Sequence, residues 1–254
     1  VTIIGENFGT DPSDISVSFN GTPAEFELVD ESTIVATTPA DYQTGSVTVT
    51  IHGYTMTGGA MFNPNSKGDV TVLYLQNYKQ PFAKANDESW KNGEWWTPAV
   101  WNQNAASFNA KGNTTVSGMQ YKSEEGLTLA FQNGWDKEAY TNGKMWQVAT
   151  LRPGKYRLEV TYAYTLVVTD AGNFISVLIA KGDSESDIPN VADLEQLNGV
   201  YVAYDKMGTA NDSGTLVTPS FEVTETTDVV IGFLTSLAKG NSCFKVTELK
   251  LILE

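Results

Sequence analysis

The chain has 254 residues, with 30 Asp and Glu against 16 Lys and Arg, which gives a formal net charge of -14 and a pI near 4.4. This length allows one or two domains, and 41% hydrophobic residues supply enough apolar material for a packed core in each. A surface this negative repels phosphate groups, which excludes sequence-independent nucleic-acid binding and attachment to anionic membranes.

Cysteine and histidine are nearly absent, which excludes much conventional chemistry. Cys243 cannot form an intramolecular disulfide, and with His52 as the one histidine it cannot build a Cys/His zinc site. We expect Cys243, in an apolar stretch, to be a small buried side chain, and His52, between a strand-like run and Gly53, to be exposed at a strand end.

No run approaches the ~20 consecutive apolar residues of a membrane span, and no signal peptide is present. The chain opens directly in a strand-like segment, so we expect any targeting segment to lie upstream of Val1.

Residues 1–62 consist of short alternating segments separated by turn residues. Asn20-Gly21 is a strong hairpin signal. Several short strands in about 60 residues favour a small β-sandwich. The strands are predicted over residues 1–4, 15–19, 24–28, 33–37 and 46–51.

Four segments of this region, in order and spacing, resemble an IPT/TIG immunoglobulin-like domain. The segments are Val1 to Gly9, with Gly-Glu-Asn-Phe-Gly at its end, Val17 to Ala24, Ser32 to Pro39, and Thr44 to Val49. The resemblance implies a spacer or docking module over residues 1–63 with no catalytic role. The family has an additional first strand, which this chain lacks; either it is cut off or the edge strand comes from elsewhere.

Residues 63–69 are polar or turn-forming and predict a domain boundary. The following domain, residues 70–254, has the length of a jelly roll with elaborated loops. Short helical turns are expected near 80–86 and 191–197. Strands are predicted over 127–131, 155–162, 174–180, 221–223, 228–233 and 244–253.

Residues 143–158, where Leu-Arg-Pro-Gly is followed by Lys-Tyr-Arg-Leu, resemble a strand connection of galactose-binding-like β-sandwich modules. The C-terminal part also resembles an uncharacterised Bacteroidetes domain found behind IPT/TIG domains in surface lipoproteins of polysaccharide-utilisation systems. These resemblances imply a carbohydrate context. They also imply a secreted protein, anchored at the outer membrane or periplasmic, with other outer-membrane glycan-uptake proteins as partners.

Four of the six tryptophans lie between Trp90 and Trp101, in a segment without strand alternation. The flat apolar face of an indole packs against the C–H face of a sugar ring, while polar neighbours such as Glu94 bind its hydroxyls. In the alternative interpretation, the loop folds back and buries its own aromatic side chains. If the backbone at Trp95-Trp96 is extended, their side chains point in opposite directions, so we expect one of the two to be available.

A second candidate loop, residues 132–143, contains Trp135, Asp136 and Tyr140, whereas Trp146 lies in a predicted strand and is expected in the core. The sequence therefore predicts an all-β, two-domain protein that binds poly- or oligosaccharide without catalysis, cofactor or metal. The predicted binding residues are Trp95, Trp96, Trp101, Trp135, Tyr140, Glu94 and Asp136.

Three alternatives stay open. A glycoside hydrolase would need a pair of carboxylates, for which Glu94, Asp136 and Glu138 lie among aromatic residues. The acidic run Asp183 to Asp187 could hold a structural calcium ion, as in galactose-binding-like modules, although a solvated loop is the simpler interpretation. A purely structural or protein-docking module would bury the tryptophans or present them on a flat apolar patch.

Overall fold

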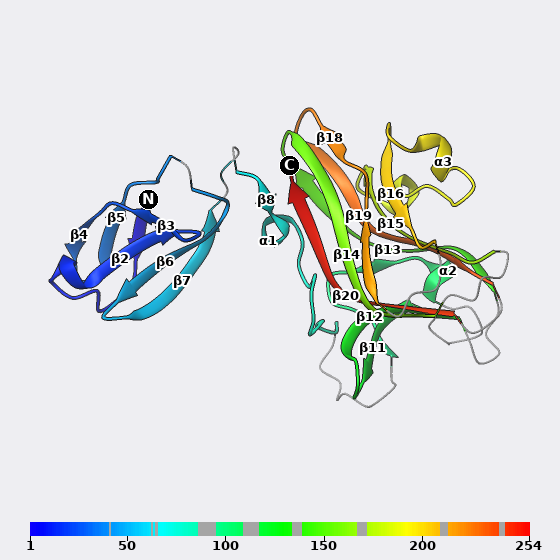
Figure 1. Cartoon of the computed structure of the whole chain (residues 1–254), viewed down its shortest axis with the longest axis horizontal. Helices are drawn as coiled ribbons and strands as arrows, with labels where there is room; N and C mark the ends of the chain where they lie inside the picture. The colour runs from blue at the N-terminus through cyan, green and yellow to red at the C-terminus, as the bar shows by residue number, and fades with distance from the viewer. Residues whose placement is uncertain are drawn as a thin grey trace. The chain divides into compact units, whose positions relative to one another are not determined.

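The computed structural model divides into two compact units, Val1–Leu73 and Tyr74–Ile252 (Figure 1). Strands dominate both units, which confirms the all-β prediction. The structure describes residues 1–40, 42–61, 63, 66–85, 95–108, 117–133, 139–166, 172–208, 213–238 and 242–254.

The first unit is an immunoglobulin-like sandwich of two antiparallel sheets around one core. The three-stranded sheet has the order β1-β5-β4, and the four-stranded sheet has the order β3-β2-β6-β7. Alternate side chains of β2, β5 and β6 point inward and form that core, among them Phe19, Ile34 and Val49. The bounds are β1 (Thr2–Ile4), η1 (Pro12–Asp14), β2 (Ile15–Phe19), β3 (Thr22–Ala24), β4 (Phe26–Asp30), β5 (Thr33–Ala36), β6 (Gly45–Ile51) and β7 (Tyr54–Met61).

Two tight turns have the backbone conformation that their residues favour. Asn20 and Gly21 have φ of 46° and 82°, and His52 and Gly53 have φ of 48° and 84°. Positive φ at both central residues is typical of the two-residue hairpin turn, so the predicted Asn20-Gly21 hairpin is confirmed. The His52 side chain is exposed at the end of β6, as expected, with Nδ1 3.4 Å from Oδ2 of Asp14.

Two parts of the first unit differ from the prediction. The strand expected over residues 24–28 is interrupted at Glu25, because the chain leaves the four-stranded sheet after β3 and enters the other sheet with β4. β7 was not predicted. Its residues from Tyr54 to Ala60 are all exposed, so the strand lacks the alternation that marks a half-buried strand.

The second unit is a β-sandwich whose six predicted strands are all confirmed. The smaller sheet has the order β10-β13-β19-β15-β16; the larger contains β17-β14-β20-β12-β11-β9, with β18 paired to β14 (Figure 1). The smaller sheet consists of β10 (Asn102–Gln103), β13 (Tyr140–Leu151), β15 (Phe174–Lys181), β16 (Val202–Lys206) and β19 (Thr227–Leu237). The larger sheet includes β9 (Trp95–Trp96), β11 (Ser117–Lys122), β12 (Gly126–Asn133), β14 (Gly154–Leu166), β17 (Gly214–Val217), β18 (Phe221–Val223) and β20 (Ser242–Leu253).

The helical content is small. The α-helices of the described residues have four residues each, and none is long enough to cross a membrane. The remaining elements are β8 (Gly68–Asp69), α1 (Thr71–Tyr74), α2 (Ala105–Phe108), η2 (Glu185–Asp187) and α3 (Leu194–Leu197), which lies within the expected 191–197.

Aromatic rings fill the space between the two sheets of the second unit. Phe233 of β19 lies 4.9 Å from Phe131 of β12 and 6.3 Å from Phe244 of β20, measured between ring centroids. The three side chains are fully buried, and Tyr162 of β14 packs 5.3 Å from Phe244. Edge and tilted contacts of this kind stabilise the pairing beyond the area they bury.

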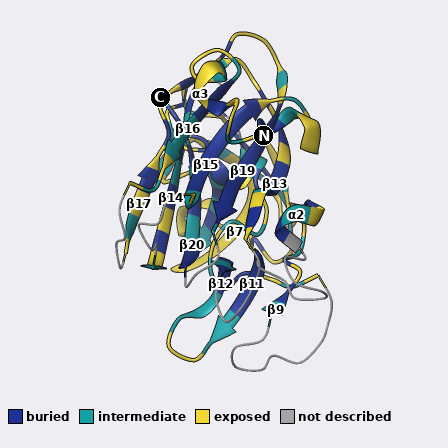
Figure 2. Cartoon of the chain, turned by 90° about the vertical axis from the view of Figure 1, so that its right-hand side faces the viewer, coloured by how far each residue is buried: buried dark blue, intermediate teal, exposed yellow. Residues whose placement is uncertain are grey.

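The opposite face of the smaller sheet is buried as well. Residues 182–201, which include η2 and α3, cover it, and Ile188 and Leu194 pack with Trp146 and Leu234 in a second apolar cluster. Figure 2 shows β15 and β19 largely in the colour of buried residues. Trp146 is therefore in the core, as predicted, but in the outer of two cores.

The close approach of β13 and β19 generates a stability prediction. A Cβ atom on Gly232 would lie 2.1 Å from the backbone oxygen of Met145 and 2.7 Å from Cα of Trp146. We expect Gly232→Ala to force these strands apart and to lower the free energy of unfolding by about 1–3 kcal/mol, measured by urea denaturation. Gly208→Ala is the control, since its Cβ would meet nothing within 4 Å. Equal stability of the two variants would contradict this reading of the strand pair.

Candidate functional site

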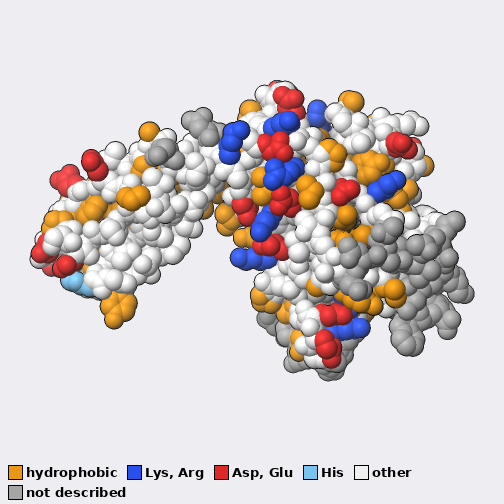
Figure 3. Space-filling model, in the orientation of Figure 1, with side chains coloured by type: hydrophobic (Ala, Val, Ile, Leu, Met, Phe, Trp, Pro, Cys, Tyr) orange, Lys and Arg blue, Asp and Glu red, His pale blue; other side chains and the backbone are white. Residues whose placement is uncertain are grey.

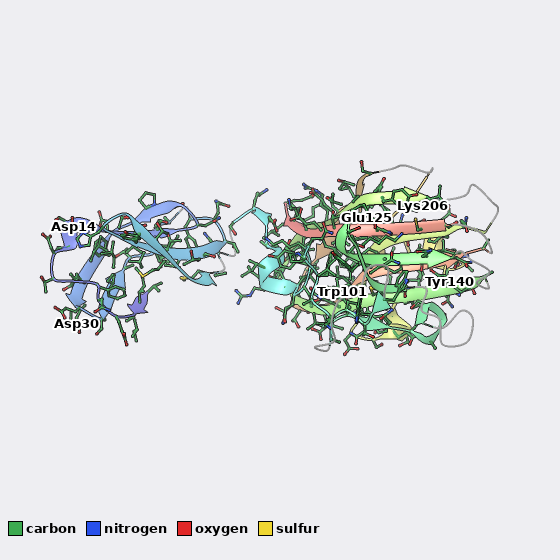
Figure 4. All side chains as sticks on the ribbon, turned by 90° about the horizontal axis from the view of Figure 1, so that it is seen from below. Asp14, Asp30, Trp101, Glu125, Tyr140 and Lys206 are labelled. Carbon is green, nitrogen blue, oxygen red and sulfur yellow. The ribbon has the colours of Figure 1, made fainter. Side chains whose placement is uncertain are left out.

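Three of the predicted binding residues lie in the interior, which corrects the expectation that they share an exposed surface. Trp96 and Trp101 are 6% and 4% exposed, and Tyr140 is 7% exposed. The indole N–H of Trp101 donates to the Asn77 carbonyl oxygen at 3.0 Å, and its ring packs on Phe233. Trp101 and Tyr140 also lie well apart along the sandwich (Figure 4). Buried rings cannot stack on a sugar.

Tyr140 is held in place by its neighbours in the strands. Its hydroxyl shares a hydrogen bond of 3.0 Å with Oγ1 of Thr235, and its ring lies over Gly143, where a Cβ atom would come within 2.5 Å of it. Burial raises the pKa of Tyr140 well above its usual range. The side chain is therefore a neutral core residue.

The Trp95-Trp96 pair alternates as expected. In the register of β9 with β11, Trp96 pairs with Met119 and Trp95 with Gln120, so the two indoles point to opposite faces of the larger sheet. Trp96 is buried and Trp95 is half-buried. Three further predicted residues, Glu94, Trp135 and Asp136, lie outside the described residues.

Charged side chains on the outer face of the larger sheet form ion pairs with one another. Blue and red side chains alternate along this face (Figure 3). Arg157 lies 2.8 Å from Glu159 and 3.2 Å from Glu254, and Lys250 lies 3.3 Å from Glu248. Such exposed pairs contribute little stability, but they leave these charges engaged with one another.

The covering segment, residues 182–201, is fixed to β13 by a buried ammonium group. Lys144, 6% exposed, donates from Nζ to the carbonyl oxygens of Ile188 at 2.6 Å and Glu185 at 3.2 Å. Burial lowers the pKa of Lys144, and the nearby Glu185 carboxylate partly opposes this. These bonds satisfy the Ile188 carbonyl group and give the Glu185 carbonyl, which already accepts the Ile188 N–H at 3.2 Å, a second donor.

Two asparagines complete the attachment. Asn104 donates from Nδ2 to Oε1 of Glu185 at 3.2 Å and accepts the backbone N–H of Lys144 at 3.0 Å. Asn142 has a φ of 56°, and its Oδ1 accepts the backbone N–H of Val191 at 2.9 Å. The amide side chains of Asn104 and Asn142 therefore hold the covering segment at two points, Glu185 and Val191.

The acidic run Asp183 to Asp187 serves as a local cap. Oδ2 of Asp187 accepts from the backbone N–H groups of Asp183 and Ser184, both at 3.0 Å, and from the Ser184 hydroxyl at 2.6 Å. The Ser184 hydroxyl and these N–H groups lower the pKa of Asp187. Among the described residues no group of three acidic, His or Cys side chains could hold a metal ion.

Beside this cap lies a hollow of about 420 Å³, which we call the Tyr201 hollow. Tyr201 donates from its hydroxyl to Oδ1 of Asp187 at 3.2 Å, and burial, with Asp187 beside it, raises its pKa to about 12. The Asn190 and Asp193 side chains have no hydrogen-bond partner in the described part of the chain. The lining includes Lys144, Ile188, Asn190, Asp193, Leu197 and Tyr201.

The Tyr201 hollow therefore combines apolar walls, an aromatic ring and free polar groups on a segment that hydrogen bonds hold in place. None of its lining residues is among the predicted binding residues. The available signal was weak: Asn142-Gly143 inside a strand marks the bulge that carries Asn142, and Asn190 to Asp193 has the composition of a turn.

A family model described as "Domain of unknown function (DUF5013)" matches residues 76–232, and the IPT/TIG domain model matches residues 1–66, which confirms the first resemblance. No curated protein matches the chain.

Several solved structures are similar to this chain. TmCBM61 in complex with β-1,4-galactotriose is 12% identical over 71% of this chain and 98% of its own, with a TM-score of 0.35. The CBM22-1 xylan-binding domain of Paenibacillus barcinonensis Xyn10C is 10% identical over 65% and 97%, with a TM-score of 0.34. SGBP-B from a xyloglucan utilization locus in Bacteroides uniformis is 13% identical over 100% and 68%, with a TM-score of 0.30.

The buried ammonium can be tested directly. We expect Lys144→Met, which keeps the length of the side chain, to leave the Ile188 carbonyl group without its donor and to lower the free energy of unfolding by about 1–3 kcal/mol. Hydrogen exchange of the amides in residues 183–201, measured by mass spectrometry, should become faster. Lys181→Met, at an exposed position of β15, is the control. Unchanged exchange in Lys144→Met would show that the ammonium does not hold the segment.

The cap at Asp187 predicts a pH dependence. Because the pKa of Asp187 is lower in the folded chain than in the unfolded one, its stabilisation is complete above the unfolded pKa and is lost as the pH falls through the folded pKa. Asp187→Ala should therefore be less stable than the original chain at pH 7, and the difference should shrink as the pH falls below about 4. Chemical denaturation across pH measures this. Asp183→Ala, which removes an exposed carboxylate of the same loop, should show no such convergence.

Proposed function

We propose that this protein, which belongs to the DUF5013 family, binds glycans without changing them, at the Tyr201 hollow of its second unit. The observation that carries the proposal is the lining: an anchored aromatic ring, apolar Leu197 and two unengaged polar side chains in one hollow. Sugars present both apolar C–H faces and hydroxyl groups, so a site of mixed lining suits them.

Each group has a definite role in this proposal. The Tyr201 ring packs against a sugar face, and because its hydroxyl is held by Asp187 the ring is already oriented. Asn190 donates and accepts through its amide, and Asp193 accepts hydroxyl protons through its carboxylate. Lys144 keeps the segment in place, so little ordering entropy is lost when a ligand enters.

The same lining supports binding over hydrolysis. Glycoside hydrolysis uses two carboxylates that flank the scissile bond. Asp193 is the one carboxylate among the described residues that line the hollow. Binding of this kind needs no metal and no cofactor. We therefore propose that the protein is non-catalytic and uses neither.

The predicted tryptophan surface stays part of the proposal as a second, separate region. Trp95 is half-buried and points to the outer face of the larger sheet. With Glu94, Trp135 and Asp136 it would form a contact for the same ligand class. The first unit would serve as a spacer, and the whole protein would act at the cell surface or in the periplasm beside other glycan-uptake proteins.

Affinity electrophoresis in gels containing β-1,4-galactan, xyloglucan, xylan or amylose tests the proposal. At least one polysaccharide should retard the protein. Tyr201→Ala and Asp193→Ala should each reduce that retardation, because each should raise the Kd for the polysaccharide about tenfold, equivalent to about 1.4 kcal/mol. Tyr54→Ala, which removes an exposed tyrosine of the first unit, and Asp183→Ala are the matched controls.

The outcomes separate the two surfaces. Retardation lost in Tyr201→Ala but retained in Trp95→Ala supports the hollow, whereas the reverse result moves the site to the tryptophan surface. If no polysaccharide retards the protein, glycan binding is contradicted. If Tyr201→Ala, Asp193→Ala and Trp95→Ala are all retarded as much as the original chain, glycan binding at these two surfaces is contradicted. Release of reducing sugar would favour the hydrolase alternative.

A further inference from the structure

A second hollow, of about 510 Å³, lies on the other side of the turn at residues 190–193. We call it the Phe174 hollow. The turn itself is closed by the Asp193 N–H donating to the Asn190 carbonyl at 3.0 Å, so its two flanks face different hollows. Asn190 and Asp193 line the Tyr201 hollow, while Val191 and Ala192 line the second one. The second lining includes Thr141, Asn142, Asn173, Phe174, Ala192 and Ser236.

The Phe174 hollow repeats the chemistry of the first. Phe174 is half-buried: it packs on the outer core and also lines the hollow, as Tyr201 does. Nδ2 of Asn142 and the hydroxyl of Thr141 have no hydrogen-bond partner among the described residues. An aromatic ring, amide donors and a hydroxyl are therefore again available together.

A bulge in β13 creates this arrangement. The register of β13 with β19 shifts between Tyr140 and Gly143, and the backbone N–H of Asn142 donates to Oγ of Ser236 at 2.9 Å. A bulge redirects side chains, which brings Thr141 and Asn142 to the lining of the hollow.

The two hollows are close and rigidly related. Lys144 lines one and Asn142 lines the other, two residues apart on β13, which is roughly 7 Å along a strand. Asn142 and Lys144 also hold the covering segment, at Val191 and Ile188. The spacing of the hollows is thus set by one strand and its hydrogen bonds.

We propose that the two hollows are neighbouring subsites for successive sugar units, so that the protein binds two or more linked units of a polysaccharide more tightly than a free monosaccharide. This inference rests on the proposed function. One unit packs on Tyr201 in the first hollow, and the next packs on Phe174 and accepts hydrogen bonds from the Asn142 amide. The Asn190–Asp193 turn lies between them and contacts both.

The test uses isothermal titration calorimetry with oligosaccharides of one to six units, prepared from whichever of β-1,4-galactan, xyloglucan, xylan or amylose retards the protein. We expect affinity to rise at least tenfold between one unit and the length that spans both hollows. Tyr201→Ala should weaken binding at every length, whereas Phe174→Ala should remove the gain with length.

Phe174 is partly in the core, so a second variant fills the hollow without disturbing that packing. Ala192→Trp, at an exposed lining position, should abolish the gain with length, and Val200→Trp, exposed and outside both linings, should leave it intact. If Tyr201→Ala weakens binding but chain length and Ala192→Trp have no effect, the subsite inference is wrong and the proposed function stands. If no glycan binds, both are wrong.

Discussion

The central strand β19 is buried on both faces, and the form of the second unit depends on this. Every residue from Val229 to Leu237 is buried. One face packs against the larger sheet through Phe233; the other carries Val230 and Leu234, which water would otherwise cover. Because exposing apolar side chains is unfavourable, the sheet needs a second cover, and residues 182–201 supply it.

A cover built from loop carries its own cost, since loop backbone groups lack the partners that strands provide. Side chains on and beside strand β13 of the smaller sheet supply the missing hydrogen-bond partners. Lys144 donates to two carbonyl groups, and Asn104 and Asn142 bind further polar groups of the segment. A buried ammonium is unfavourable without such partners, so the loop and the lysine stabilise each other. The same bonds fix the loop geometry.

Glycan binding, as proposed, would use this rigidity. The walls of both hollows include residues of a segment held at known points of β13, whereas Trp96 and Trp101, two of the tryptophans that suggested sugar binding, are buried in the interior. Trp101 and Trp96 fill space between the sheets, and Trp146 fills the outer core. An indole is a good sugar platform and an equally good core residue, because both roles depend on the same apolar area. Local sequence does not distinguish them.

Local pattern by itself determined the strands and turns. Alternating side chains predicted Ile15–Phe19 and Phe221–Val223 to the residue, and Asn20-Gly21 predicted its turn, because these features depend on neighbours in the chain. Tertiary structure alone decided which aromatic rings are buried and which polar side chains share a hollow. Asn142 and Val191 meet only once the covering segment has folded onto the sheet, and Tyr201 and Asp187 meet only once that segment has folded on itself. Such contacts join residues distant in sequence, and residue spacing does not specify them.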